Sequence, residues 1–398
     1  MINLAIKEIV HTRFRYFLTA VGLGLLIGTT LTMVGLVRGM AADAVTLIRS
    51  SNADLWVVQK NTEGPFAESS TMYDDVYRSI AGLRGVAGAA NAAYLTLQIG
   101  QGNREVRALV VGFDPDSSLG APPHLVAGRP ITRSHYEAIA DVKTGFKVGD
   151  KIMIRRDEYT VVGLTSGMVS SSGDPVVFIT LQDAQTEQFE KDNDYIYNER
   201  ARLAANPEFN PPDDPGLLQA ITSYQESSNM VNTVLVRVAP GYDPNAVAAY
   251  IRRWKYYSVY TYQPMAQLLL VNVNGIALRQ LGMFMAILTI VGVAIIMLII
   301  YIMTMGKIKE IAILKLIGAK NRTIVSMILQ EAWGLGVLGF FIGKIAASLW
   351  APLFPKRIEF IFTDSITAFL FTMFFCTLAS VLSIRAALKV QPSSAIGD

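Results

Sequence analysis

The 398-residue chain is 52% hydrophobic and only 17% charged, whereas about 25% of the residues of an ordinary soluble domain are charged. This deficit of charge indicates a membrane protein. The formal net charge of +3 gives no indication of a nucleic-acid partner, and we expect none. The single cysteine, Cys376, excludes an intramolecular disulfide and a cysteine-rich metal site, so packing alone must hold the fold.

The N-terminal leader, residues 1–15, predicts an amphipathic helix that lies on the cytoplasmic surface of the membrane. A merely solvated leader is the alternative. The apolar face would carry Ile2, Ala5, Ile6, Ile9 and Val10, with Lys7, Glu8 and His11 opposite.

Four apolar segments are long enough to cross a bilayer, for which about 20 residues are needed. They are residues 16–37, 280–305, 324–350 and 365–384. A cleaved signal peptide is the alternative for the first, because Ala42-Asp43-Ala44 resembles a cleavage site. Its apolar stretch is longer than the roughly 7–15 residues of a signal sequence, so we retain it as a span.

The orientation of the spans follows from the basic residues in the short flanking segments. Residues 1–15, 306–323 and 385–398 are rich in lysine and arginine, whereas the loop 351–364 carries only Lys356 and Arg357. We therefore expect both termini in the cytoplasm of a bacterial cell and the protein in its inner membrane. Residues 38–279 and 351–364 would lie outside.

Residues 38–279 form a large insert between the first two spans, and their pattern predicts an extracytoplasmic α+β domain. The fold class is therefore a membrane protein with four transmembrane helices and this one inserted domain. The expected strands are residues 54–59, 106–112, 151–154, 159–164, 176–180, 233–238 and 256–262, the third and fourth forming a hairpin. The expected helices are residues 73–83, 181–189 and 245–254.

Three features of the insert favour structural interpretations. Residues 206–215 are rich in proline and predict a loop that separates two lobes or forms a mobile flap. The run Ser170-Ser171-Ser172-Gly173 predicts a flexible turn. Tyrosines suit a strand close to a membrane, and a ligand-binding role is the alternative for the cluster Tyr256, Tyr257, Tyr260 and Tyr262.

Catalytic motifs are missing from the sequence. It contains no G-x-x-x-x-G-K-[ST] phosphate-binding loop, no H-E-x-x-H and no G-x-S-x-G. The adjacent acids Asp74-Asp75 and Asp213-Asp214 are interpreted as solvated surface. We therefore expect no catalytic residue, no metal site and no cofactor bound by this chain.

Two ionisable residues, Glu331 and Lys344, interrupt the third span, and a charge inside a membrane is a functional candidate. We expect Glu331 to face other helices. Lys344 lies near the external end, where its long side chain is expected to reach the headgroups. A proton pathway would normally need a longer chain of such groups.

Glycines four residues apart occur in two spans and permit close contact between helices. The pairs are Gly24 with Gly28 and Gly339 with Gly343. They suggest contacts between two copies of the chain, and packing within one chain is the alternative.

The link 306–323 predicts a short helix that ends at Gly318, because glycine favours the C-terminal cap of a helix. Apolar residues surround this helix almost completely. A membrane surface covers only one face, so the other face needs a protein partner, unless the chain itself covers it beneath the bundle. The apolar residues are Ile311, Ala312, Ile313, Leu316 and Ile317.

The same link resembles the coupling segment of MacB/FtsX-type permeases, roughly R-E-I-G-I-L-R-A-L-G-A. Three further segments are similar to family motifs, and so is the order of one span, a large insert and three spans. These segments are Leu329-Gln330-Glu331-Ala332 with Gly339 and Gly343, the tail 386–396, and Val148-Gly149-Asp150 with Val161-Val162-Gly163. Residues 52–57 and 111–115 look most like the DevC/HrtB branch.

The resemblance implies a permease subunit of an ABC exporter that works by mechanotransmission. A separate ATPase subunit, carrying ATP and Mg, would drive motion of the external domain and export of an amphiphilic or hydrophobic substrate. The coupling residues would be Lys309, Glu310, Ile311, Ile313, Leu314, Leu316 and Gly318.

The resemblance also implies a homodimer, with a periplasmic adaptor protein as a further candidate partner. The main alternative is an FtsX-like signalling scaffold that regulates an external enzyme or sensor. A membrane-anchored receptor without ATPase coupling is the second alternative.

Overall fold

The computed structural model describes residues 13–189, 193–211, 215–226, 230–254, 256–354 and 356–389. The chain divides into two compact units, residues 41–275 and a second unit formed by the segments before and after them. Within the described residues, four helices are long and apolar enough to cross a membrane. The helix expected for the leader falls almost wholly on residues 1–12, which lie outside the described residues.

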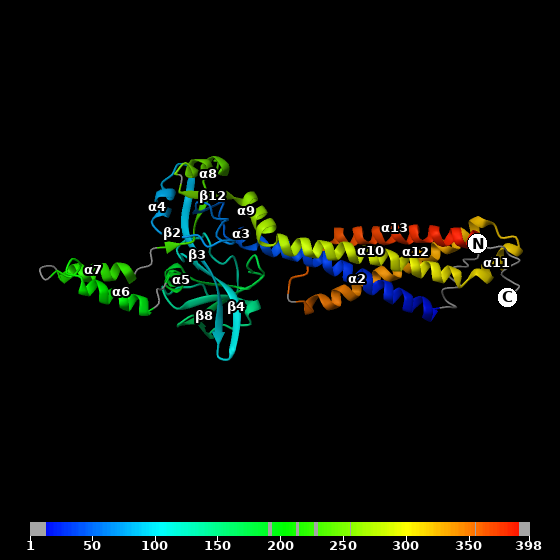
Figure 1. Ribbon diagram of the computed structural model, residues 1–398, viewed down its shortest axis with the longest axis horizontal. Helices are drawn as coiled ribbons and strands as arrows, with labels where there is room; N and C mark the ends of the chain where they lie inside the picture. Colours follow the sequence, from blue (N-terminus) through cyan, green and yellow to red (C-terminus); the bar gives the residue numbers. More distant parts are fainter. Residues whose placement is uncertain are drawn as a thin grey trace. The chain divides into compact units, whose positions relative to one another are not determined.

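The membrane unit is a bundle of long helices (Figure 1). They are α2 (Arg13–Ala44), α10 (Gly275–Met305), α12 (Asn321–Trp350) and α13 (Phe362–Lys389), with the short α11 (Ile308–Leu316) between α10 and α12 and η3 (Ala351–Leu353) after α12. Each long helix contains one predicted span; α2 and α13 extend past both of its ends, and α10 and α12 extend past its N-terminal end only. The extensions are polar or mixed in sequence, so hydropathy alone did not include them.

One face of α2 forms the centre of the bundle. Its buried residues recur at intervals of three or four, as expected for a helix that contacts neighbours along a single stripe. They pack with buried residues of α10, α12 and α13, including Ile296, Leu335 and Cys376. The buried stripe of α2 consists of Tyr16, Ala20, Leu23, Ile27 and Leu31.

The inserted domain is built on a mixed ten-stranded sheet of order β12-β1-β11-β3-β4-β9-β6-β8-β5, with β7 pairing β3 and β8. The β4–β9 and β6–β8 pairs are parallel, and all other pairs are antiparallel. The strands are β1 (Leu55–Gln59), β3 (Val86–Gln101), β4 (Arg104–Phe113), β5 (Leu125–Gly128), β6 (Glu137–Asp141), β7 (Lys151–Ile154), β8 (Asp157–Thr165), β9 (Val176–Thr180), β11 (Thr233–Val238) and β12 (Tyr257–Thr261).

The remaining elements of the domain are short. A second, two-stranded sheet joins β2 (Met72–Tyr73) to β10 (Met230–Val231). The helices are α3 (Thr46–Ser50), α4 (Val76–Ala81), η1 (Val142–Thr144), α5 (Leu181–Phe189), α6 (Asn193–Ala205), α7 (Pro215–Glu226), α8 (Pro244–Arg252), α9 (Tyr262–Leu268) and η2 (Leu269–Val273). The domain is therefore α+β, as predicted.

Most of the predicted strands and helices of the insert are confirmed, and the β7–β8 hairpin is tighter than expected. Its turn is Arg155-Arg156, because Asp157 and Glu158 already pair with β7. The expectation for the proline-rich segment was wrong in part. Pro215 starts α7, where the fixed φ of proline suits the first turn of a helix. Residues 206–211 follow α6, residues 212–214 lie outside the described residues, and the domain on both sides of the segment is one compact unit and not two lobes.

Candidate functional site

The short helix α11 has defined caps at both ends. Lys307 is its N-cap, and its last turn closes with the two hydrogen bonds of a Schellman motif. The N–H of Ala319 donates to Leu314 O at 2.9 Å, and the N–H of Gly318 donates to Lys315 O at 3.1 Å. Gly318 has a φ of +90°, which only glycine adopts without strain. The predicted glycine cap is confirmed.

The two faces of α11 have different surroundings. Ile311 and Ala312 are each 1% exposed. Ile311 belongs to an apolar cluster with residues of α12 and α13, against which Leu314 also packs. Of the predicted coupling residues, Ile311 and Leu314 therefore face the bundle and not a partner. The chain covers one face of the helix, which was the alternative that the sequence left open.

The opposite face of α11, called the outer face below, is exposed. Ile313 is 49% exposed, Leu316 is 59% exposed and Ile317 is 79% exposed. The charged side chains of Lys309 and Glu310 are exposed too. An apolar surface of this kind, rimmed by charges, is typical of a protein interaction site.

Glu331 forms a nearly buried ion pair with Lys307. The Lys307 Nζ lies 2.5 Å from Glu331 Oε1, and the two side chains are 13% and 12% exposed. The Tyr16 hydroxyl of α2 donates to the backbone carbonyl of Glu331 at 3.0 Å. The prediction that Glu331 faces other helices is confirmed, but no sequence pattern indicated Lys307 as its partner.

Lys315 connects the other end of α11 to α13. Its Nζ donates to Leu388 O at 2.9 Å and to Ala387 O at 3.4 Å. These carbonyls belong to the last turn of α13, where backbone acceptors have no partner within the helix and a cation is favourable. The α11 helix is thus held to α12 near its N-terminus and to α13 near its C-terminus.

Lys344 contacts a neighbouring helix, which the sequence did not indicate. Its Nζ donates to the Ser365 hydroxyl in the first turn of α13 at 3.0 Å. At the same end of the bundle, Arg38 of α2 forms an ion pair with Asp364 of α13, and its Nη2 donates to Asp364 Oδ1 at 2.6 Å. Both contacts join helices within one chain.

The four glycines close the contact between α2 and α12. A Cβ added to Gly343 would lie 2.5 Å from Gly24 O and 2.9 Å from Gly28 N. A Cβ added to Gly24 would lie 3.0 Å from Gly339 O. Because backbone atoms occupy this space, the glycines pack within one chain. They therefore give no support to the predicted dimer.

An apolar pocket of about 360 Å³ lies between α2, α10 and α13. Its walls include Leu26, Met285 and Phe371. The few polar groups are threonine hydroxyls and Asp364, which also pairs with Arg38. Its size and lining are those of sites for small apolar or amphiphilic molecules.

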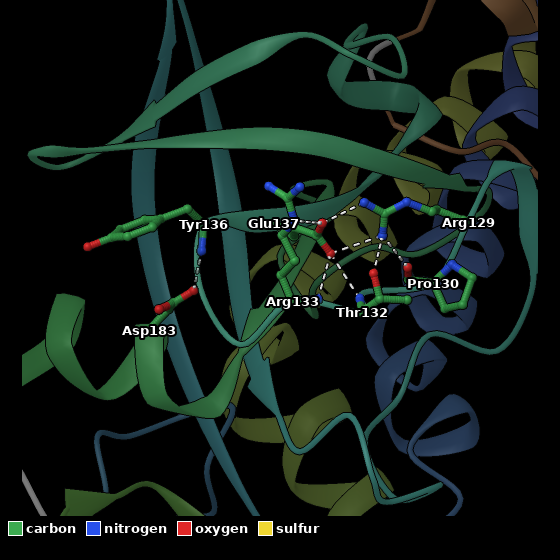
Figure 2. A network of polar contacts seen from close by, with 7 residues as sticks. All are labelled: Arg129, Pro130, Thr132, Arg133, Tyr136, Glu137 and Asp183. Carbon is green, nitrogen blue, oxygen red and sulfur yellow. Dashed lines mark hydrogen bonds and ion pairs between the residues drawn. The ribbon is translucent and has the colours of Figure 1, made fainter.

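A polar network in the inserted domain centres on Glu137 at the start of β6 (Figure 2). Its carboxylate accepts from Arg129 Nη1 and Nη2 at 3.0 and 2.5 Å and from the N–H groups of Thr132 and Arg133 at 2.9 and 3.1 Å. The Arg129 guanidinium, with these N–H donors, lowers the pKa of Glu137 to about 2. Nearby, Asp183 of α5 accepts from the N–H of Tyr136 at 2.9 Å.

The Glu137 network is a structural brace, because donors within the same loop use its acceptors. No sequence motif marks these residues. Among the described residues, no group of three histidine, cysteine or acidic side chains could hold a metal. The tyrosine cluster does not converge on one site either, since Tyr260 donates to Thr62 O while the Tyr262 hydroxyl accepts from Arg49.

Two family models match the chain. The MacB-like periplasmic core domain matches residues 16–254, and the FtsX-like permease C-terminal model matches residues 282–392. An uncharacterised ABC transporter permease of Mycobacterium tuberculosis is 22% identical over 397 residues, which cover 100% of this chain and 99% of the relative. A putative hemin transport system permease protein, HrtB of Staphylococcus haemolyticus, is 23% identical over 401 residues and 99% of both chains.

Among solved structures, the periplasmic region of MacB from Actinobacillus actinomycetemcomitans aligns with 56% of this chain and 96% of its own length, with 10% identity and a TM-score of 0.36. The family models together extend over both units of the chain. The chain is therefore a multi-pass membrane protein that belongs to the MacB/FtsX family of ABC transporter permeases.

Proposed function

We propose that this chain is the permease subunit of an ABC exporter that works by mechanotransmission. A separate ATPase subunit, which binds ATP and Mg, would dock on the outer face of α11. The observation that carries this proposal is the division of α11 into a buried face, fixed to α12 and α13, and an exposed apolar face. A helix held in this way would transmit a force applied to its outer face to the helices of the bundle.

The proposed orientation places α11 and the ends of α2 and α13 beside it in the cytoplasm. Lysines and arginines are concentrated in the segments at this end, as the positive-inside rule requires of a cytoplasmic side. The inserted domain then lies outside the bacterial inner membrane. A homodimer with two ATPase subunits, and a periplasmic adaptor, are expected from the family resemblance.

The proposed substrate is an amphiphilic or hydrophobic molecule. The pocket between α2, α10 and α13 supports this class, because apolar side chains and a few hydroxyls form its walls. The staphylococcal relative is named as a hemin transport permease, and hemin is an amphiphile.

A pull-down of the detergent-solubilised chain, co-expressed with the ABC ATPases of its host, tests the proposal. We expect one ATPase to co-purify and to be lost in the double variant Ile313→Asp with Leu316→Asp. Leu353→Asp, at an 83% exposed leucine in η3, is the matched control and should retain the ATPase. Recovery of no ATPase with the wild-type chain would reject the proposal and favour the receptor or scaffold alternative.

A further inference from the structure

Glu331 connects its own helix to α2 and to the link between α10 and α11. Its carboxylate contacts Lys307, the second of the two residues in this link, and its backbone carbonyl accepts a hydrogen bond from Tyr16 of α2. Glu331 itself belongs to α12. The contacts come from residues 24 and 315 positions away in the sequence. A displacement of α12 at this position therefore involves α2, α10 and α11.

Water cannot hydrate Lys307 and Glu331 in place of their ion pair unless the bundle opens. The cavity beside Glu331 measures about 10 Å³, which is close to the minimum volume that one water molecule requires. Its lining is apolar apart from Thr304 and Glu331. The pair, whose side chains are 13% and 12% exposed, therefore holds α11 against α12 while the bundle is closed.

Lys307 is also an unusual N-cap, because a positive charge at the start of a helix opposes the helix dipole. The carboxylate of Glu331 supplies the negative charge that this position favours. The side chain of Lys307 therefore has an electrostatic reason to stay at Glu331. Lys315 holds the opposite end of α11 to α13, so both ends of the helix are attached while its outer face is exposed.

We propose that the Lys307–Glu331 pair is the joint through which a displacement of α11 passes to α12. Lys307 and Glu331 are then positioning residues for coupling. They lie outside the outer face of α11, on which the ATPase would dock. This inference rests on the proposed function and names the residues that transmit the movement.

The test uses the complete complex of the chain with its co-purified ATPase in lipid nanodiscs. Hydrogen exchange of α12 and of residues 41–275 is compared without nucleotide and with Mg-ATP plus vanadate. We expect the wild-type complex to show a nucleotide-dependent change in exchange. Glu331→Gln and Lys307→Gln should retain the ATPase, because the outer face of α11 is unchanged, but should lose most of this change.

The charge-swapped double variant Lys307→Glu with Glu331→Lys keeps a complementary pair and should restore the nucleotide-dependent change. If the single variants lost the change only because they were poorly folded, exchanging the two charges would not restore it. The conservative variant Glu331→Asp provides a second folded control with partial coupling. The inference is overturned if Glu331→Gln retains the full change, or if the charge swap fails to restore it.

The proposed function fails in a different way. Loss of the ATPase from the wild-type complex, or its retention by the double variant Ile313→Asp with Leu316→Asp, would reject docking on α11 and this inference with it. Normal docking together with unaltered coupling in Glu331→Gln would reject the joint alone.

Discussion

Two buried glutamates, Glu137 and Glu331, show how differently the two units use a carboxylate. Glu137 in the inserted domain is 3% exposed, and its partners are four to eight residues away in the same loop. Glu331 in the bundle is 9% exposed and contacts residues 24 and 315 positions away. The first set of contacts stabilises one loop, whereas the second joins residues of separate helices. The low exposed fraction of both glutamates does not distinguish these two roles. The sequence separation between each glutamate and its partners does.

The largest expected effect comes from removal of the joint. Glu331→Ala leaves the Lys307 ammonium nearly buried without its partner, and breaking such a pair costs about 3–5 kcal/mol. We expect a marked loss of folded protein, measured by unfolding in mixed micelles with SDS. The double variant Lys307→Met with Glu331→Met removes both charges and should recover most of the loss. A small effect of Glu331→Ala would mean that the pair is solvated.

Gly343→Ala tests whether the bundle depends on the close approach of α2 and α12. The added Cβ would lie 2.5 Å from Gly24 O, and backbone cannot move aside as a side chain can. Overpacking of this kind costs about 1–3 kcal/mol, and the same unfolding assay should detect it. Gly22→Ala, where a Cβ meets nothing within 4 Å, is the matched control and should be neutral. Equal stability of the two variants in this assay would contradict the close contact between α2 and α12.

The Glu137 brace should show a pH dependence that follows from its lowered pKa. Its pKa is lowered from 4.5 to about 2 in the folded state, so its stabilisation is present above pH 4.5. The stabilisation declines as the pH falls from 4.5 toward 2, because the unfolded state then binds the proton first. Hydrogen exchange of residues 129–141 in the wild type and in Glu137→Gln should differ at pH 6.

The expected difference at pH 6 is about 1–2 kcal/mol, which is typical of hydrogen bonds to a charged group. The half-exposed Arg129 contributes little of this, because solvent screens its charge. The difference between the two proteins should shrink at pH 3. A difference that grew at low pH would show that the sign of the pKa shift is wrong.

The smallest expected effect on stability is at the outer face of α11. Ile313→Ser removes a half-exposed side chain, and surface substitutions usually change stability by less than about 0.5 kcal/mol. We therefore expect normal unfolding together with weaker ATPase binding. Ile311→Ser, one position on the buried face, should instead destabilise the protein. Similar losses of stability in both variants would show that α11 has no free face.

Local patterns in the sequence were sufficient for the four spans, the α11 helix with its glycine cap, and the β7–β8 hairpin. Each depends on residues close together in the chain: a run of apolar residues about 20 long, a glycine at a helix end, or two β-rich runs beside a turn. The longest strand, β3, was missed because it is rich in alanine, which is depleted in strands. Pairing with β11 on one side and with β4 on the other stabilises it.

Contacts between distant residues required the tertiary structure. The sequence presented Glu331 as an isolated intramembrane charge, and only the packing of α10, α11 and α12 provides Lys307 as its partner. The glycine pairs suggested a close helix contact but did not identify the neighbouring helix. The structure places the two pairs against each other within one chain. Local sequence patterns therefore predicted the spans, α11 and most strands, whereas β3 depends on its partners in the sheet. The tertiary structure decided which side chains contact each other, because the topology brings together residues that are far apart in the sequence. A buried charge then pairs with the opposite charge that lies beside it, and a glycine leaves room for the helix that packs against it.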